Sequence, residues 1–446
     1  MIPGVVCSLL FAAIIYKWRF FSLPGIPRRW LLAAFAVKLI AGLMLWYVYT
    51  HHYSASHASD AHRYYDDAMV INAQWHENRE VFWSLMLGNG EDSSTAYQSV
   101  YNKLVGWYSG YRYGLTNDCR TIIRIHVVIS FLSFGSYHVH WICMAFFAFT
   151  GLVALYRAFS EIFVSRKIWL FTACFALPSV VFWSAGLLKE GPTMLGLGLL
   201  FWSISLLLSN HKIWYAYPML ILSVLLLVTI KEYVLFSMFP AIAFLLFVKL
   251  AGQRRLMLKF ICVQLLCFLV AQNAHHFFIG GDFLYVLNKK RVDFENTAML
   301  RGANSVVYVP ATADVQSFTL HYPQAFALAY YRPFVWEIRS PFYIAFAVEN
   351  LCYALLAVLT ILFFKPPPAA HRAMLLAALS FVLVLASIIG NTVPVLGSVV
   401  RYRIAALPLL VIVCAACIDY DKLRSLRIFL AKRAKPAGEQ VAHREQ

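Results

Sequence analysis

The sequence predicts an all-α protein, a polytopic transmembrane helical bundle of about eleven spans with further helices in the membrane interface. Of the 446 residues, 61% are hydrophobic and only 13% are charged, whereas a soluble domain usually has about 25% charged residues. Long apolar runs recur along almost the whole sequence, and a run inside lipid must be helical because lipid cannot satisfy an open backbone. The alternating pattern of a membrane β-strand is absent from the sequence.

Eleven apolar runs are predicted to cross the membrane. In chain order they cover 2–17, 30–50, 136–156, 168–186, 192–209, 213–230, 233–250, 257–275, 341–363, 373–390 and 404–419. The first run is barely long enough for about 30 Å of hydrocarbon, so whether it crosses fully stays open. It lacks a basic n-region and a cleavage site, which favours a retained helix over a removed signal peptide.

The distribution of Lys and Arg predicts the orientation, because basic residues gather in cytoplasmic connections. They are concentrated at 17–29, 157–167 and 249–259 and again after residue 421, all on one side of the alternating spans. We therefore expect the N-terminus outside and the C-terminus in the cytoplasm, with the two long polar segments 51–124 and 277–340 on the extracytoplasmic side.

The chain is expected to form a single transmembrane domain over 1–430, followed by a disordered, basic cytoplasmic tail over 431–446. The stretches 81–87 and 97–113 are amphipathic or rich in Tyr and Trp, which indicates helices lying at the headgroup level. The stretch 125–135 is predicted to be a further interfacial or re-entrant helix before the third span.

The net charge of +17 does not indicate nucleic-acid binding, because most Lys and Arg lie in short connections where they set orientation. Membrane lipids are the expected surroundings. The nine cysteines show no metal-site spacing and imply no disulfide framework, and the pair Cys414 and Cys417 lies on an apolar run where packing explains it. Four histidines fit no strong metal-ligand motif: His51, His52, His57 and His62. P-loop, Rossmann and HExxH motifs are absent from the sequence.

The densest cluster of charge is the stretch 59–67, which reads Ser-Asp-Ala-His-Arg-Tyr-Tyr-Asp-Asp and follows the second span. In a helix, Asp60, Arg63, Tyr64 and Asp67 would share one face. A carboxylate held ionised by a neighbouring arginine can take a proton from a hydroxyl nucleophile, which makes these residues candidates for general-base catalysis. The alternative is structural, with Asp60 capping the helix and Arg63 and Asp67 forming an i,i+4 pair.

Two short charged turns lie on the same extracytoplasmic side. Lys189 precedes Glu190 between the fourth and fifth spans, and Lys231 precedes Glu232 between the sixth and seventh. Basic groups at this depth would suit an anionic lipid headgroup. The alternatives are that Lys189 snorkels to the interface or pairs with its neighbour Glu190.

A third group of charges surrounds the ninth span. Arg332 and Glu337 stand at its entrance, and Glu349 lies inside it. A carboxylate within a membrane is expensive and is usually functional or paired. A buried pair that locks helices together is the alternative, and Lys38 in the second span is a candidate partner.

The entry to the last span reads Arg401-Tyr402-Arg403. Two arginines that flank a tyrosine at the outer surface suit a phosphate or pyrophosphate group. Interfacial anchoring is the alternative interpretation of these two residues.

Several of these stretches resemble a known family. Asp60 with Tyr64 and Tyr65, in a D-x-x-x-Y-Y context soon after an early span, is similar to the first-loop motif of GT-C glycosyltransferases. The turn at 182–190, the entry at 401–404 and the stretch 332–337 look like uncharacterised bacterial membrane proteins of this kind. This chain has Lys-Glu where their turn has Lys-Asp, and one additional span precedes its first-loop motif.

The resemblance implies an enzyme of the bacterial inner membrane that takes a sugar from undecaprenyl phosphate or pyrophosphate. The acceptor hydroxyl, on a glycan, lipid or protein, would be deprotonated by Asp60 with Arg63 and Asp67 beside it, and the anomeric configuration would be inverted. The residues expected to bind the substrate are Tyr64, Lys189, Lys231, Arg332, Glu337, Arg401 and Arg403. No cofactor and no metal site are expected, although a divalent cation stays open.

Two other functions compete with this one. An O-antigen-type polysaccharide polymerase would depend mainly on Arg332, Arg401 and Arg403 and would not need Asp60. A transporter of lipid-linked glycans would place its charges at the membrane midplane and would be built from inverted repeats, and no internal repeat is visible in the sequence. A membrane scaffold without enzymatic activity is the remaining alternative.

Overall fold

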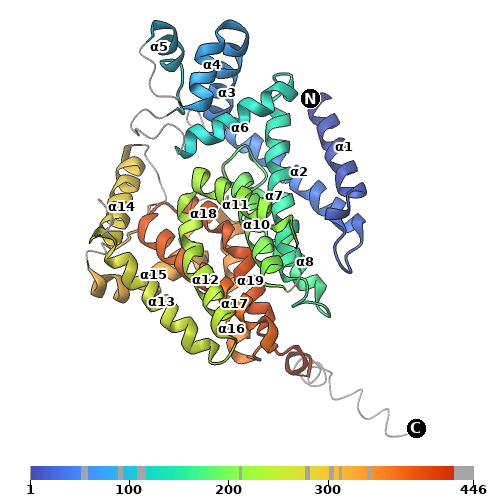
Figure 1. The fold of residues 1–446 in the computed structure, drawn as a ribbon, viewed down its shortest axis with the longest axis vertical. Coiled ribbons are helices and arrows are strands. Elements are labelled where there is room, and N and C mark those ends of the chain that lie inside the picture. Colours follow the sequence, from blue (N-terminus) through green and yellow to red (C-terminus); the bar gives the residue numbers. More distant parts are fainter. Residues whose placement is uncertain are drawn as a thin grey trace.

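The computed structural model describes residues 2–51, 59–88, 94–107, 117–209, 213–276, 282–300, 306–310, 314–338 and 343–425. These residues are helical almost throughout (Figure 1). In the part of the chain described, β-pairing is limited to two isolated bridges, Val306 with Val395 and Phe364 with Ile418. The predicted all-α fold is therefore confirmed.

The N-terminal half of the bundle is built around the pair α7 and α10. Its long helices are α1 (Ile2–Lys17), α2 (Arg28–His51), α7 (Tyr137–Phe159), α10 (Glu190–Leu208) and α11 (Ala216–Ile230). α1 and α2 pack on one side of α7, and α10 packs on another side, with α11 beyond it. Glu190 is the first residue of α10, and Lys189 directly precedes it. The packing of α10 therefore fixes where these two charges lie.

The C-terminal half is centred on α17, against which α12, α14, α15 and α19 pack. Its helices are α12 (Glu232–Ala251), α13 (Leu256–Gln272), α14 (Phe283–Leu300), α15 (Val315–Tyr331), α16 (Ile344–Leu362), α17 (Ala369–Thr392), α18 (Leu396–Tyr402) and α19 (Leu407–Ala416). α18 carries Arg401 near its C-terminus, and the short 3-10 turn that follows it carries Arg403.

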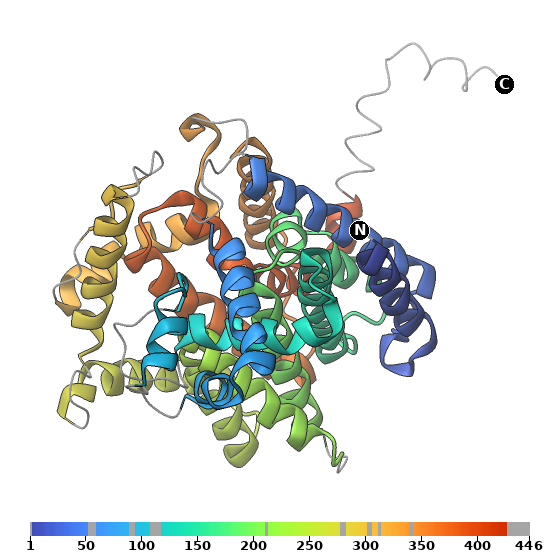
Figure 2. The same ribbon diagram turned by 90° about the horizontal axis from the view of Figure 1, so that it is seen from above.

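Four helices of the first polar segment lie together at one end of the bundle (Figures 1 and 2). They are α3 (Asp60–Glu77), α4 (Arg79–Leu87), α5 (Thr95–Tyr101) and α6 (Asp118–Ser133). The expected helices are present in part: α4 covers 81–87, α5 covers only the beginning of 97–113 and is followed by non-helical residues at 102–107, and α6 runs through most of 125–135. The end of the second stretch, from 108 to 113, lies outside the described residues.

The predicted count of eleven spans is not confirmed. Within the described ranges, six helices are long and apolar enough to cross a membrane, namely α2, α7, α10, α12, α16 and α17. A seventh span results if Leu396–Ala405 and Leu407–Ala416 form one element bent by 59°. α1, α11 and α13 are shorter apolar helices.

The run 168–186 is not one helix. It breaks into α8 (Lys167–Phe175) and α9 (Pro178–Trp183), with Pro178 at the first turn of α9. Proline has no backbone N–H to donate and its ring collides with the preceding turn, so it starts a new helix instead of continuing the old one. Apolar length in the sequence therefore overestimates helix length at this place.

The second polar segment, 277–340, is not only a polar loop, because it contains a helix, α15, that packs on α17. The hydroxyl group of Tyr330 in α15 donates to the carbonyl oxygen of Val382 at 2.7 Å, and that of Tyr322 donates to Leu383 at 3.1 Å. Ala325, Leu328 and Ala329 are buried against the bundle. α15 therefore belongs to the helical bundle, because one of its faces is apolar and packs on α17.

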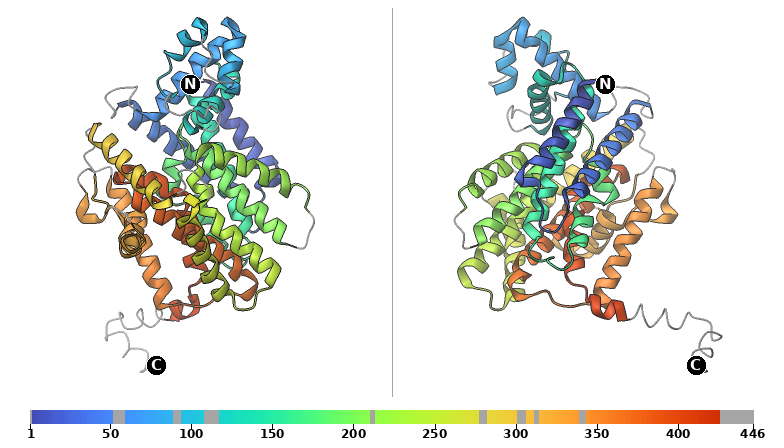
Figure 3. Two further views of the ribbon diagram at one scale, coloured as in Figure 1. Left: turned by 60° about the vertical axis from the view of Figure 1, so that its left-hand side comes forward. Right: turned by 90° about the vertical axis from the view of Figure 1, so that its right-hand side faces the viewer.

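The C-terminal end of the described chain lies at the end of the bundle opposite α3 and α4 (Figure 3), and the basic connection at 157–167 contacts both it and the connection at 17–29. Arg157, at the end of α7, donates to the carbonyl oxygens of Phe20 and Ser22. Arg166 stacks on the ring of Tyr420 with its guanidinium carbon 4.2 Å from the ring centre. Three of the four basic regions thus contact one another, and their location on the cytoplasmic side stays a prediction. The tail at 431–446 lies outside the described residues.

The crossing of α7 and α10 depends on glycine. A Cβ atom on Gly198 would collide with the backbone of Gly151 in the neighbouring helix, and small residues are what allow membrane helices to approach this closely. We expect Gly198→Ala to lower the stability of the bundle by about 1–3 kcal/mol, the usual cost of overpacking. Thermal unfolding in detergent checks this, with Ser205→Ala on the same helix as the control. An unchanged melting temperature in Gly198→Ala would contradict the close crossing.

Candidate functional site

The N-terminus of α3 delivers Asp60 to the bundle. Ser59 caps the helix, and its hydroxyl oxygen accepts from the backbone N–H of His62 at 3.3 Å. The capping role that the sequence left open for Asp60 therefore belongs to Ser59. This leaves the carboxylate of Asp60 available for a partner from elsewhere in the chain.

That partner is Arg401, which is 341 positions away in the sequence. One terminal nitrogen of Arg401, Nη1, lies 3.0 Å from Oδ2 of Asp60, and its Nε lies 2.7 Å from Oε1 of Glu190. The amine of Lys231 lies 2.8 Å from the same oxygen of Glu190. Glu190 therefore joins α10, α12 and α18 through one carboxylate, and Arg401 extends the connection to α3.

Lys189 forms a second ion pair, with Asp118 at the start of α6. Their atoms Nζ and Oδ2 are 2.6 Å apart, and the Lys189 amine also lies 3.1 Å from the sulfur of Cys119. Asn117 caps α6 by accepting from two backbone N–H groups. The alternative in which Lys189 pairs with Glu190 is therefore wrong, because Lys189 pairs with Asp118 and Glu190 pairs with cations from other helices.

Tyrosine rings line the cations of this cluster. Lys189 lies 5.5 Å from the ring centre of Tyr64, and Lys231 lies 4.7 Å from that of Tyr402 and 5.8 Å from that of Tyr233. Aromatic faces attract cations through their quadrupole. Tyr64, which was also expected to bind substrate, is buried and its ring lies against the Lys189 amine. It therefore supports a cation that was expected to bind substrate.

A non-helical segment positions Lys189. The chain leaves α9 at Trp183 and enters α10 at Glu190, and the residues between them are buried against α2. Lys38 of α2 donates to the hydroxyl oxygen of Ser184 at 2.6 Å. This contact ties the segment to α2 just before it reaches the charge cluster.

Burial differs between the members of the cluster, which we define as Asp60, Asp118, Lys189, Glu190, Lys231 and Arg401. The side chains of Glu190, Lys231 and Lys189 are 1%, 7% and 9% exposed. Those of Asp60 and Asp118 are 34% and 54% exposed. The cations and Glu190 thus form the floor of the cluster, and the two aspartates form its mouth.

The electrostatic environment keeps Asp60 ionised. Burial would raise the pKa of its carboxyl group, but the guanidinium of Arg401 and the amine of Lys189 outweigh burial and lower that pKa below its ordinary value. The pKa of Lys189 is raised, since Asp118 outweighs the effect of burial. Burial raises the pKa of the Cys119 thiol despite the adjacent amine, which does not favour a thiolate nucleophile.

Two buried polar atoms, one in the cluster and one beside Lys231, have no hydrogen-bond partner among the residues described. They are Oε2 of Glu190 and the hydroxyl group of Tyr233. Buried polar atoms are almost always satisfied. The floor of the cluster thus has hydrogen-bonding capacity left over for a further polar group.

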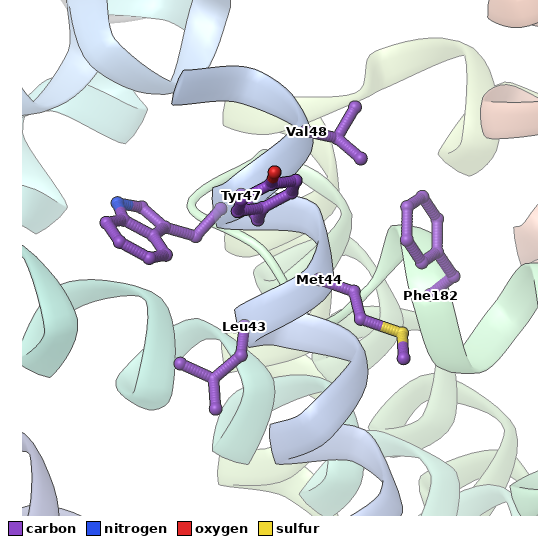
Figure 4. A pocket seen from close by; sticks show the side chains of 6 residues that line it. Leu43, Met44, Tyr47, Val48 and Phe182 are labelled. Atoms are coloured by element: carbon purple, nitrogen blue, oxygen red, sulfur yellow. The ribbon is translucent and has the colours of Figure 1, made fainter. Parts of the chain in front are cut away.

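Two apolar pockets that share Phe182 lie along the exposed side of α2, and we refer to the two together as the apolar groove. Its lower part encloses about 790 Å³ and lies between Trp30 and Ala41 of α2 and the neighbouring α9 and α16. Its upper part is lined from Leu43 to Val48, and Phe182 borders both parts. Figure 4 shows Met44 and Val48 on the side of α2 that faces Phe182.

The groove ends close to the charge cluster. Tyr49 directly follows Val48, and it lies near enough to Arg401 to interact electrostatically. From residue 30 to residue 48, the helix rises by roughly 27 Å at 1.5 Å per residue. The groove therefore offers an apolar surface about as long as a lipid tail, and the charge cluster lies near one end of it.

Arg403 was expected to bind substrate, which stays a prediction, but its contacts in the structure lie inside the bundle. Its side chain is fully buried and donates to three backbone carbonyls at the end of α15, with Nη1 3.0 Å from the oxygen of Arg332. Its Nη2 donates to Oδ1 of Asn350 at 2.6 Å. These bonds use Arg403 to hold α15, α16 and α18 together, because helix-end carbonyls need donors.

Arg332 and Glu337 form a bidentate pair with each other within one turn. Glu337 also accepts from the backbone N–H of Phe334 at 2.9 Å. Among the ion pairs of the described residues, none connects these two with the cluster. Their expected role in substrate binding therefore remains a prediction without support from the cluster's geometry.

Glu349 and Lys38 were candidate partners of each other, but in the structure each one bonds other residues. Glu349 accepts from the backbone N–H of Ser179 at 3.1 Å and from the hydroxyl group of Tyr353 at 2.5 Å. Lys38 bonds Ser184, as described above. Both therefore fasten α9 and the segment after it to neighbouring helices.

Asp67, which was expected to be catalytic, contacts a loop outside the cluster, and its catalytic role stays a prediction. Its two carboxylate oxygens accept from the backbone N–H groups of Val105 at 2.9 Å and Gly106 at 2.8 Å. Burial raises the pKa of Asp67 in spite of these bonds. Arg63 lies beside the same loop at Gly106. The ion pairs given for the cluster involve other residues. The catalytic role expected for Arg63 stays a prediction.

The sequence did not identify three members of the site: Asp118, Glu190 and, among the supporting groups, Tyr233. A signal for Asp118 exists, since Asn-Asp before an apolar periodic run is typical of a helix start. Glu190 was noted only as a neighbour of Lys189. Its pairing with two cations from other helices requires the tertiary fold and leaves no local pattern.

The role of Arg403 leads to a prediction about stability. We expect Arg403→Lys to cost about 3–5 kcal/mol, because an ammonium cannot reach all the acceptors and leaves buried groups unpaired. Thermal unfolding in detergent measures this, with Arg372→Lys, on an exposed side chain, as the control. Unchanged stability combined with lost ligand binding would instead place Arg403 in the site.

No protein-family model, curated protein sequence or solved structure matches this chain significantly.

Proposed function

We propose that the protein is a membrane glycosyltransferase that moves a sugar from a polyprenyl phosphate or pyrophosphate to an acceptor hydroxyl on the extracytoplasmic face. The observation that carries this proposal is the ion pair between Asp60 and Arg401, which joins a candidate base and a candidate phosphate ligand from opposite ends of the chain. The apolar groove along α2 supports it, because a long isoprenoid tail needs an apolar surface beside its charged headgroup.

The proposed reaction is a single displacement. Asp60 takes the proton from the acceptor hydroxyl while the oxygen of that hydroxyl forms a bond to the anomeric carbon. The bond between the anomeric carbon and the phosphate oxygen breaks, and its electron pair stays on the phosphate. Arg401 and Lys189 then stabilise the charge that develops on the leaving phosphate. The configuration at the anomeric carbon is inverted.

The location of Asp60 supports its assignment as the base over Glu190. Asp60 lies at the exposed mouth, whereas Glu190 is buried and shared by two cations. A base must reach the proton that it removes. Two other residues expected to bind phosphate, Arg403 and Arg332, are occupied elsewhere, which weighs against the polymerase that would depend on them.

The test uses the full-length protein reconstituted in liposomes of zwitterionic lipid. Short-chain polyprenyl phosphates and pyrophosphates carrying single hexoses serve as donors, and release of the free polyprenyl phosphate is followed by mass spectrometry. We expect release that depends on the protein and on an acceptor sugar. A protein that releases polyprenyl phosphate from none of these donors, while binding them, would contradict the proposal.

A further inference from the structure

The charge cluster is already neutral and closed without a substrate. Its three cations, Lys189, Lys231 and Arg401, are matched by three carboxylates, Asp60, Asp118 and Glu190, through the ion pairs described above. A phosphate group that entered this cluster would bring surplus negative charge. It could form short contacts with the cations only if a carboxylate gave up its place.

The exposure of the three carboxylates indicates which of them can leave. Glu190 is 1% exposed and is held by two cations, so separating it would strand buried charges, which is strongly unfavourable. Asp60 and Asp118 are 34% and 54% exposed, and the ion pairs given for each involve one cation. Water can solvate these two when they separate from the cations, because exposed ion pairs contribute little.

We propose that Asp60 and Asp118 are exchangeable counter-ions that occupy Arg401 and Lys189 until a lipid phosphate headgroup takes their place. Glu190 stays behind and keeps Arg401 and Lys231 in position. The unpartnered Oε2 of Glu190 and hydroxyl group of Tyr233 lie on the same floor. A headgroup or its attached sugar would find a hydrogen-bonding group there.

The exchange would also regulate the reaction, in a step that rests on the proposed function. While Arg401 holds Asp60, the carboxylate is a weak base, since the guanidinium lowers its pKa. Once the phosphate occupies Arg401, Asp60 loses that partner and becomes a stronger base. The base is therefore released only when the donor is bound, which protects the site from acting on an acceptor alone.

The exchange predicts an unusual effect of removing a charged residue from a binding site. Asp60→Asn should bind a phosphate headgroup more tightly than the wild type, by about two- to fivefold, the range expected for a partly exposed ion pair. Asp118→Asn should show the same gain through Lys189. Asp66→Asn is the matched control, since it removes the same charge from α3 outside the cluster, and it should change nothing.

The experiment measures binding of farnesyl phosphate to the full-length protein in phosphatidylcholine nanodiscs by calorimetry. Farnesol and inorganic phosphate are the comparison probes. Tighter binding by Asp60→Asn and Asp118→Asn but not by Asp66→Asn supports the exchange. In an Arg401→Gln background, the gain from Asp60→Asn should disappear, because there is no guanidinium to release.

Weaker or unchanged binding in both Asp60→Asn and Asp118→Asn would overturn the exchange. If inorganic phosphate bound as tightly as farnesyl phosphate, with the same gains, the lipid source of the headgroup would be overturned. The two proposals fail separately: a protein that shows the gains but transfers no sugar retains the exchange and loses the proposed function. A protein that transfers sugar without the gains retains the function and loses the exchange.

Discussion

Asp60→Asn should reduce sugar transfer by about 10²–10⁴-fold, the contribution expected of a positioned general base. Asparagine keeps the size and shape of the side chain and can still hydrogen-bond Arg401, so the fold around α3 should persist. The loss should appear in kcat, because the proton is transferred in the transition state, whereas donor binding should become tighter, as described above. Steady-state release of polyprenyl phosphate measures this.

The matched control is again Asp66→Asn, six positions further along α3. It should keep wild-type kcat. Asp60→Glu should recover part of the activity, since it restores a carboxylate at a slightly longer reach. Full activity in Asp60→Asn would contradict the mechanism and would favour a polymerase that depends on arginines alone.

Arg401→Lys is expected to lower the transfer rate by about 10²–10³-fold, the usual cost of removing one preorganised donor at a developing charge. An ammonium keeps the positive charge but lacks the planar fork with which Arg401 contacts Asp60 and Glu190 together. A lysine at this position can therefore contact only one group at a time, either Asp60, Glu190 or a phosphate.

Arg372→Lys serves as the control for Arg401→Lys, because its exposed side chain contacts only a nearby carbonyl in the described contacts. The measurement is single-turnover transfer from a saturating donor, which separates chemistry from binding. Arg332→Lys distinguishes the alternatives: it should leave the rate within a few-fold of the wild type. A loss as large as that of Arg401→Lys would return Arg332 to the site and support the polymerase.

The fold class followed from the sequence because hydrophobic composition and the needs of the backbone in lipid leave few alternatives. The number of spans did not follow. Pro178 interrupts an apolar run, and the last run bends near Pro408, so the continuous hydrophobicity of both regions concealed breaks in the helices. The apolar face of α15 was overlooked because polar residues at its surface dilute it.

The candidate site was predicted in part. Asp60, Lys189, Lys231 and Arg401 were each expected, and the structure brings all four together. Their pairing could not be predicted, since Glu190 and Asp118 come from helices whose approach depends on packing. Arg403 shows that a residue expected to lie in the site from its position in the sequence can instead contact other parts of the bundle. Two positions from Arg401, it faces the opposite way, and no spacing argument distinguishes a substrate ligand from a clamp on helix-end carbonyls.

The most direct test of the site is a cryo-electron microscopy structure of the protein with a non-transferable polyprenyl phosphonate sugar. The account predicts the phosphonate between Arg401 and Lys189, Asp60 separated from Arg401 and facing the anomeric carbon, and the isoprenoid chain along α2 between Val48 and Trp30. A headgroup bound at the opposite, basic end of the bundle, or a phosphonate that leaves the pair of Asp60 and Arg401 unchanged, would contradict it.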